Sequence, residues 1–544
     1  MVQSKMKIII SQWDESTRLS IKKMQRSHKK LWIRRVPLES QTNKSTFLRL
    51  EEVQAPQDIN KTVLKYKKVD KKIRPVPTRI PNHMKVIRRF PEDPLKNLPI
   101  LPFHPPKFCP TTRITKERMD SLAIDKNTEL LPEEIRLLKH VLVLNERSVA
   151  FDEQERGTFR SDYFSDYKMP VIDHIPWQEK NIALPRGYHD EIIRLLKEKA
   201  IAGVYEEAQS SYRSRWFCVI KKNGELRIVH DLQKLNGVSV KDAGVPPILE
   251  EFVEAYAGRS IYTVLDMYWG FHARMLDVES RDMTAFQTPL GEFRITSLPM
   301  GYTNSPTEFQ ACMMFILQDE VPNVAGVFID DIPIKGPATK YLTPDGQEEC
   351  LTENPGVRRY IWEHLNDVHR ILHRLGEVGG TVSGKKMQLC QSEVEILGQK
   401  CSTKGREPVD SRTKKVEDWP TPINLKEVQG FLGLCGTVRI WIQDYSIIAK
   451  PLVDLTRKNV EFHWESPQEE AFQILKRLVS SAPALKPIDY SSDRPVYLSV
   501  DTSIYGIGFI LSQEDESGRR APARYGSLPL KEIESRYGQS KLEL

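Results

Sequence analysis

Three acidic residues stand at the ends of two short apolar runs. Asp330 and Asp331 lie side by side within the run 327–334, and Asp266 follows the run 261–265. Apolar runs of this length are typical of buried strands. Carboxylates suit Mg²⁺, and two metal ions about 3.5–4 Å apart hold the attacking and leaving oxygens in phosphoryl and nucleotidyl transfer. The pattern favours two-metal chemistry, although an Asp-Asp pair between short β-runs is also a good hairpin turn.

The elements that must position these carboxylates follow from periodicity. Two strands flank an Asn-Gly turn at Asn223-Gly224 and predict a hairpin with a basic tip, Lys221-Lys222. Asn424 with Glu427 three residues later predicts the start of a helix by a capping box. Residues 323–335 are predicted to form a second hairpin, which bears Asp330 and Asp331. Further strands are predicted over 261–267, 496–501 and 507–511, and further helices over 132–149, 188–200, 304–320 and 360–376.

Composition indicates an ordinary globular protein of several domains. The 544 residues are 40% hydrophobic and 28% charged, so cores of normal size can form. No run approaches the roughly 20 apolar residues of a membrane span, and we expect an intracellular, non-secreted protein. The seven cysteines are scattered without a C-x-x-C pair, which indicates neither a disulfide framework nor a zinc site.

Positive charge is concentrated at the start of the chain. Residues 1–110 hold 25 Lys/Arg against 9 Asp/Glu, whereas the whole chain has a net charge of +7. With little periodicity and frequent proline, residues 1–115 are expected to form a largely disordered basic arm. Such an arm fits a polyanionic partner, and a solvated tail is the equal alternative.

Taken together, the motifs resemble, in order, the reverse transcriptase of gypsy-type LTR retrotransposon Pol polyproteins, in the form found in fungal elements. The resemblance runs from about residue 175 to the C-terminus. Its motifs are Leu226-Arg227-Ile228-Val229-His230-Asp231-Leu232, Thr263-Val264-Leu265-Asp266 through His272, Leu298-Pro299-Met300-Gly301 through Pro306, Phe328-Ile329-Asp330-Asp331, Lys385-Lys386, Ile396-Leu397-Gly398 and Gly430-Phe431-Leu432-Gly433.

The resemblance implies an α+β fold, a right-hand polymerase followed by a truncated RNase H-like α/β domain. The implied domains are a basic arm over 1–115, a helical linker over 116–180, fingers over 181–258, a palm over 259–400, a thumb over 401–458 and a partial RNase H-like domain over 459–544.

The resemblance also implies residue roles. Asp266, Asp330 and Asp331 would be catalytic and would hold two Mg²⁺ ions, with Mn²⁺ as an alternative. Nucleotide binding would fall to Lys221, Lys222, Arg227, Phe271, Gly301 and Lys386, with Phe271 as a steric gate against ribose. Leu397 and Gly398 would form the primer grip, and Asp501 and Glu543 would belong to the RNase H-like site, whose remaining carboxylates we do not find.

The expected function is therefore an RNA-directed DNA polymerase that uses an RNA template, a DNA primer and dNTPs, in the cytoplasm (virus-like particles) or the nucleus. RNase H activity is doubtful because the domain is truncated. The alternative is a catalytically degenerate fragment that only binds nucleic acid. The sequence leaves open whether the chain is processed from a larger polyprotein, and it leaves open the oligomeric state.

Overall fold

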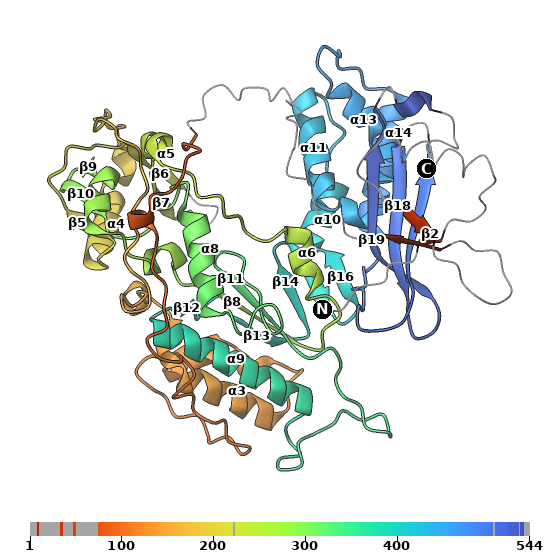
Figure 1. Cartoon of the computed structure of the whole chain (residues 1–544), viewed down its shortest axis with the longest axis horizontal. Helices are drawn as coiled ribbons and strands as arrows, with labels where there is room; N and C mark the ends of the chain where they lie inside the picture. Colours follow the sequence, from red (N-terminus) through yellow and green to blue (C-terminus); the bar gives the residue numbers. More distant parts are fainter. Residues whose placement is uncertain are drawn as a thin grey trace. The chain divides into compact units, whose positions relative to one another are not determined.

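The computed structural model divides into two compact units. The larger unit comprises residues 65–252 and 259–394, and the smaller unit comprises residues 1–64, 253–258 and 395–544. The structure describes residues 8–9, 33–35, 47–50 and 74–537, apart from 221–223, 504–505 and 532–533 (Figure 1). Within this described part of the chain, no helix is both long and apolar enough to cross a membrane.

A three-stranded antiparallel sheet forms the centre of the larger unit. Strand β8 (Tyr262–Asp266) lies between β11 (Asp331–Lys335) and β13 (Gln388–Gln391). The register pairs Asp331 with Asp266 and Lys335 with Tyr262. Because four of the five β8 residues are buried, the strand fits a position with both faces covered.

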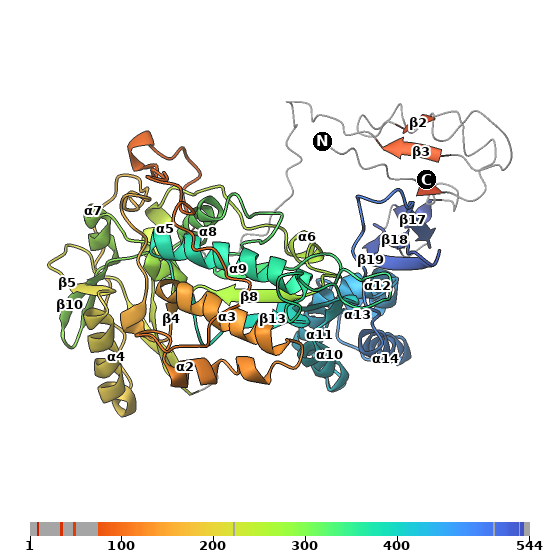
Figure 2. The same ribbon diagram turned by 90° about the horizontal axis from the view of Figure 1, so that it is seen from below.

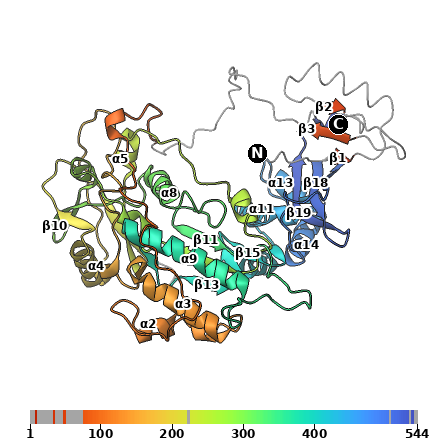
Figure 3. The ribbon, with the colours of Figure 1, turned by 60° about the horizontal axis from the view of Figure 1, so that its bottom comes forward.

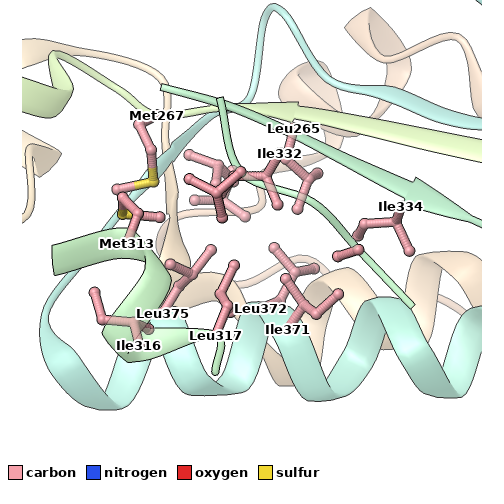
Figure 4. Close-up of a cluster of buried hydrophobic side chains, with 14 of the residues drawn as sticks. Leu265, Met267, Met313, Ile316, Leu317, Ile332, Ile334, Ile371, Leu372 and Leu375 are labelled. Atoms are coloured by element: carbon pink, nitrogen blue, oxygen red, sulfur yellow. The ribbon is translucent and has the colours of Figure 1, made fainter. Parts of the chain in front are cut away.

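Two helices cover one face of this sheet. Figure 4 shows Leu265 and Ile332 from the strands packed against Ile316 and Leu317, at the end of α8 (Ser305–Ile316), and against residues of α9 (Arg359–Val378). The buried residues of α9 recur every three or four positions, as an amphipathic helix requires. The helix ends at Gly379, whose φ of 83° suits a glycine C-cap. Helix α3 (Pro132–Leu144) lies alongside α9 in every view (Figures 1, 2 and 3).

A second sheet of the larger unit packs on a separate hydrophobic core. Its strands are β5 (Tyr205–Glu207), β10 (Gly291–Ile295) and β9 (Phe286–Thr288), in that order. Helix α4 (His189–Ile201) and the hairpin of β6 (Trp216–Ile220) and β7 (Leu226–His230) contribute to the same core. The predicted hairpin is thus present, and its tip lies outside the described residues.

Residues 74–115 differ from the expected disordered arm. Val76 forms a parallel bridge with Val240, and the side chains of Leu101 and Ile114 are buried in the main core of the larger unit. Arg88 reaches Glu308 on α8 at 2.5 Å. The segment has little regular secondary structure, yet single apolar side chains fix it. The part of the arm before residue 74 lies almost entirely outside the described residues.

Shorter elements complete the larger unit and its edges. They are η1 (Asn82–Met84), α2 (Lys116–Ser121), η2 (Ile124–Lys126), η3 (Glu146–Ser148), β4 (Val149–Ala150), η4 (Glu153–Glu155), η5 (Arg186–Tyr188), α5 (Gln233–Val238), α6 (Leu249–Glu254), η6 (Gly270–Ala273), α7 (Val278–Arg281), η7 (Asp282–Thr284) and β12 (Val382–Ser383).

The smaller unit combines a helical cluster with an antiparallel sheet. The predicted N-cap is present, because the Asn424 side chain accepts a hydrogen bond from the backbone N–H of Glu427 at 3.0 Å. The elements are β1 (Ile8–Ile9), β2 (Ile33–Arg35), β3 (Phe47–Leu50), β14 (Glu393–Ile396) at the boundary, β15 (Gln399–Ser402), β16 (Gly405–Pro408), α10 (Asp410–Glu417), α11 (Leu425–Thr437), η8 (Arg439–Trp441), α12 (Tyr445–Ile448), α13 (Lys450–Leu455), α14 (Ser466–Ser480), β17 (Val496–Thr502), β18 (Gly506–Glu514), β19 (Arg520–Pro529) and η9 (Glu534–Arg536).

Candidate active site

The central sheet brings the three predicted carboxylates to one end. Asp266 is the last residue of β8, and Asp331, the first of β11, is its cross-strand partner. Asp330 lies in the two-residue turn before β11, and its backbone carbonyl accepts a hydrogen bond from Met267 at 2.9 Å. Directly opposed residues on antiparallel strands have Cβ atoms about 4.5–5.5 Å apart, so register alone makes the side chains of Asp266 and Asp331 neighbours.

The turn that carries Asp330 is strained. Phe328 and Asp331 exchange backbone hydrogen bonds of 2.9 and 3.1 Å, which closes a two-residue hairpin. Ile329 occupies the left-handed region with φ of 59°, a rare conformation for a β-branched residue. Buried Gln310 holds this turn, because its side chain accepts from Ile329 N at 2.7 Å and donates to the Val327 carbonyl at 3.0 Å.

The electrostatics of the carboxylates are those of like charges held together. Burial, and then the charges of Asp330 and Asp266, raise the pKa of Asp331 to about 6. Burial raises the pKa of Asp330 as well, with a further contribution from Asp266. The Lys386 ammonium partly compensates this negative charge, because it lies 2.9 and 3.1 Å from the two carboxylate oxygens of Asp266.

The donor set fits a hard divalent cation. All three side chains offer carboxylate oxygens, which Mg²⁺ prefers, and the Lys386 ammonium already places a positive charge against Asp266. Among the described residues, no group of three or more His, Cys, Asp or Glu side chains is arranged to hold a metal ion. Asp266, Asp330 and Asp331 are the residues that would hold such an ion.

A cavity of about 610 Å³ opens beside the carboxylates of Asp266 and Asp330, and Asp331 is not among the residues that line it. It is lined by five residues that the sequence predicted for the site: Asp266, Asp330, Arg227, Phe271 and Lys386. These come from strands β7 and β8, from η6 and from two turns, so a single cavity brings them together. Lys221 and Lys222, at the hairpin tip, lie outside the described residues.

Contacts around the cavity fix several of these side chains. The Arg227 guanidinium lies 2.9 Å from the sulfur of Met300, which also lines the cavity. The next residue, Gly301, has φ of 91°, a conformation that favours glycine, and its carbonyl accepts from Asn236 at 2.9 Å. The Phe271 ring meets Phe309 edge-on, with centroids 5.5 Å apart.

The other predicted residues lie in the smaller unit or beyond the described chain. Leu397 and Gly398 form the turn between β14 and β15, with φ of 49° and 77°. Asp501 is exposed on β17, and its charge adds to burial in raising the pKa of Asp444. Glu543 lies outside the described residues.

Sequence reasoning missed two groups of residues. Gln310 lies on α8 and was not singled out because a glutamine in a helix carries no periodic signal. Lys199 on α4 places its ammonium 2.8 Å from the centroid of the Trp269 ring, although the two residues are far apart in sequence. The tryptophan two residues before the predicted gate residue Phe271 was the one available hint.

Family models match the two parts of the chain. Residues 219–401 match the family described as reverse transcriptase (RNA-dependent DNA polymerase), and residues 464–544 match the RNase H-like domain found in reverse transcriptase. Residues 219–401 are therefore similar to reverse transcriptases, and residues 464–544 are similar to the RNase H-like domain found in them.

More particularly, the chain is related to Pol polyproteins of LTR retrotransposons. It is 26% identical over 404 residues to the retrovirus-related Pol polyprotein from transposon 297 of Drosophila melanogaster, covering 73% of this chain and 35% of that protein. It is 26% identical over 435 residues to the transposon Tf2-3 polyprotein of Schizosaccharomyces pombe, covering 79% of this chain and 28% of that protein. The chain thus spans about a third or less of the length of these relatives.

Solved structures share the fold. The foamy viral protease-reverse transcriptase dRH in complex with double-stranded DNA has a TM-score of 0.67 and 22% identity, covering 80% of this chain and 72% of that chain. The same viral protein in complex with an RNA/DNA hybrid has a TM-score of 0.63 and 20% identity, covering 80% and 55%. The predicted α+β polymerase fold followed by an RNase H-like region is confirmed.

Proposed function

We propose that this chain is an RNA-directed DNA polymerase of a gypsy-type retrotransposon of the kind found in fungi. The observation that carries the proposal is the meeting of Asp266, Asp330, Phe271, Arg227 and Lys386 in one cavity of about 610 Å³. Few other activities need adjacent carboxylates beside a cavity that basic side chains also line.

In this proposal the carboxylates of Asp266, Asp330 and Asp331 hold two Mg²⁺ ions, with Mn²⁺ as the alternative. Bound there, the ions supply the charge that activates the primer 3′-hydroxyl and neutralises the pyrophosphate leaving group. Lys386 pairs with Asp266, and with an ion bound there its ammonium would contact the leaving phosphates. Burial, and then the neighbouring carboxylates, raise the pKa values of Asp330 and Asp331, and a cation bound between these groups would offset both effects.

The chain's own residues orient the nucleotide. Arg227 and the hairpin-tip lysines Lys221 and Lys222 approach the triphosphate from the fingers side. Phe271 forms the wall against the sugar and excludes a ribose 2′-hydroxyl. Gly301 allows the backbone to come close to the nucleotide.

The proposed partners are an RNA template, a DNA primer and dNTPs inside the cell, in virus-like particles or the nucleus. The solved complexes of the foamy viral protein with double-stranded DNA and with an RNA/DNA hybrid support this class of partner. Leu397 and Gly398 are proposed to contact the primer, and Asp501 and Glu543 are proposed to belong to an RNase H-like site.

The second candidate is a protein that binds nucleic acid without catalysis. The Lys386–Asp266 ion pair favours it, since a lysine that stayed in place would keep a metal ion from Asp266. Both candidates predict binding of a template-primer, and they differ only in nucleotide incorporation.

The deciding experiment is primer extension by the purified chain on poly(rA)/oligo(dT) with Mg²⁺, beside Asp266→Asn and Asp330→Asn. Each variant should lose more than about a hundredfold in incorporation rate, because a preorganised charge in the transition state is worth at least that much. Template-primer affinity, measured by fluorescence anisotropy, should stay within about twofold. Asp345→Asn, at an exposed loop position, is the matched control.

Two results would overturn the proposal. Near-normal extension by either variant would remove these carboxylates from the chemistry. Tight binding without any extension by the unaltered chain would favour the second candidate.

A further inference from the structure

Trp269 has a backbone conformation that its side chain does not favour. Its φ of 50° and ψ of 48° lie in the left-handed region, where a bulky residue is a clear outlier. Such a conformation persists only where surrounding contacts over-determine it. Trp269 is also the residue directly before η6, the single turn of helix that carries Phe271.

Lys199 supplies the contact that holds the Trp269 ring. Its ammonium lies 2.8 Å from the ring centroid, well inside the reach of a cation–π interaction. On the ring's other contacts, Tyr268 is nearly parallel at 6.0 Å and His272 is tilted at 5.6 Å. The lysine side chain is only 19% exposed, so solvent screens this contact weakly.

Lys199 is itself held in place by an ion pair and is largely shielded from solvent. Glu153 lies 3.5 Å from its ammonium. Burial lowers the pKa of Lys199 to about 8, against the opposing charge of Glu153, while Arg156 lowers it further and Glu198 raises it. A desolvated cation is strongly attracted to an aromatic face. The Lys199–Trp269 contact is therefore a stronger constraint than a surface lysine would provide.

Trp269 transmits this constraint to Phe271 through one turn of backbone. His272 N donates to the Trp269 carbonyl at 2.8 Å, and the Arg156 guanidinium donates to the His272 carbonyl. On the far side of the turn, a Cβ added at Gly270 would lie 2.8 Å from the Phe309 ring, so the turn cannot shift inward. Lys199, Trp269 and Phe271 line the same cavity.

We propose that Lys199 is a positioning residue for sugar selection: it clamps Trp269 and so fixes the place of the Phe271 ring in the nucleotide cavity. This inference rests on the proposed polymerase function. The ammonium of Lys199 pairs with Glu153 and lies over the Trp269 ring, so the lysine acts through Trp269. Its effect is therefore on which sugar the site accepts rather than on the chemical step.

The test compares Lys199→Met, which removes the cation at similar length, with Lys199→Arg, which keeps it. Lys197→Met, at an exposed position of the same helix, is the matched control. The measurement is the ratio of kcat/KM for dTTP to that for ribothymidine triphosphate on poly(rA)/oligo(dT). We expect Lys199→Met to lower this ratio about three- to tenfold, the range of a partly desolvated cation–π contact. The dTTP kcat should change by less than about twofold.

Two further variants show whether the effect passes through the gate. Lys199→Arg should restore the ratio to within about twofold of the unaltered chain. Phe271→Ala should lose most of the selection against ribose. Adding Lys199→Met to Phe271→Ala should lower the dTTP to ribothymidine triphosphate ratio no further, because both changes act through the Phe271 ring. An additive loss in the double variant would overturn the coupling.

Hydrogen exchange separates this inference from the proposed function. Exchange in a peptide covering residues 266–273 should be faster in Lys199→Met than in Lys197→Met, whether or not the chain polymerises. If the unaltered chain extends no primer, the polymerase proposal fails. The hydrogen-exchange rates of residues 266–273 then decide alone whether Lys199 fixes Trp269. If Lys199→Met fails to fold, Glu153→Gln, which loosens the lysine's anchor, takes its place in both measurements. Unchanged sugar selection together with unchanged exchange would overturn the proposal.

Discussion

Glu308→Gln is expected to weaken the larger unit by removing the anion shared between two guanidinium groups. Glu308 Oε1 accepts from Arg274 Nε at 3.0 Å, and Oε2 accepts from Arg88 Nη2 at 2.5 Å. The side chains of Arg274 and Glu308 are 1% and 4% exposed. Glutamine keeps the shape and one acceptor but leaves the buried Arg274 without a counter-charge.

The magnitude follows from this burial. Removing one partner of a buried ion pair costs about 3–5 kcal/mol, and the remaining amide acceptor places Glu308→Gln near the lower end, about 3 kcal/mol. Arg88→Met should cost less, about 1 kcal/mol, because Arg88 is partly exposed and Glu308 keeps Arg274. Glu279→Gln is the control: this glutamate side chain is 84% exposed beside Lys168, and its loss should cost under about 0.5 kcal/mol.

The loss should reach the active site as well as the fold. Arg274 N donates to the Phe271 carbonyl at 3.2 Å, and Leu298 N donates to the Arg274 carbonyl at 2.9 Å. Glu308 therefore supports, through Arg274, the backbone at Phe271, which lines the cavity, and at Leu298, which precedes the lining residue Pro299. Incorporation by Glu308→Gln should fall about tenfold or more even where the chain is folded, since a displacement of about 1 Å can cost a hundredfold.

The assay is urea unfolding followed by hydrogen exchange of peptides from residues 262–316, which reports on the larger unit alone. The order Glu308→Gln, Arg88→Met, Glu279→Gln should appear in the free energies of unfolding. Surface substitutions usually change the free energy of unfolding by less than about 0.5 kcal/mol. If the free energy of unfolding of Glu308→Gln lies within that range of the unaltered chain, the buried charges do not stabilise this unit and the reasoning is refuted.

Two other predictions concern the arm and the hairpin turn. Removing residues 1–110 should abolish primer extension. Burial of Leu101 alone is worth about 1.5–3 kcal/mol, and the Arg88 ion pair is lost with it. Extension at the normal rate by that truncation would contradict the packed position of residues 74–110. Gln310→Met should lower the incorporation rate about tenfold or more while template binding persists. The change leaves Ile329 N and the Val327 carbonyl without their buried partner, which costs about 1–3 kcal/mol for each group. A rate equal to that of the unaltered chain would show that the turn holds its shape alone.

Elements with strong local patterns could be predicted from the sequence. The apolar stripe over 360–376 corresponds to α9 (Arg359–Val378), and the capping residues at Asn424 correspond to the start of α11. The position of Asp330 and Asp331 in a hairpin also followed from local pattern, because two short apolar runs around a polar pair have few other arrangements.

Contacts between distant side chains could not be predicted in this way. Lys386 meets Asp266 across 120 residues, and Arg88 meets Glu308 across 220. Single ion pairs carry no periodicity, so nothing local marks them. The segment 74–115 was misjudged for the same reason: isolated residues such as Leu101 bury themselves without any repeating pattern.

The candidate site lies between two residues in left-handed backbone conformations that their side chains disfavour, Trp269 after the first carboxylate and Ile329 before the other two. Each is held by one polar side chain from another element, Lys199 on α4 or Gln310 on α8. Strain of this kind persists only while its tertiary contacts last. A change at Lys199 should therefore alter the geometry of the cavity at a smaller cost in stability than changes in the apolar core of Figure 4. For Lys199, sugar selection is thus a more sensitive measure of this contact than melting temperature.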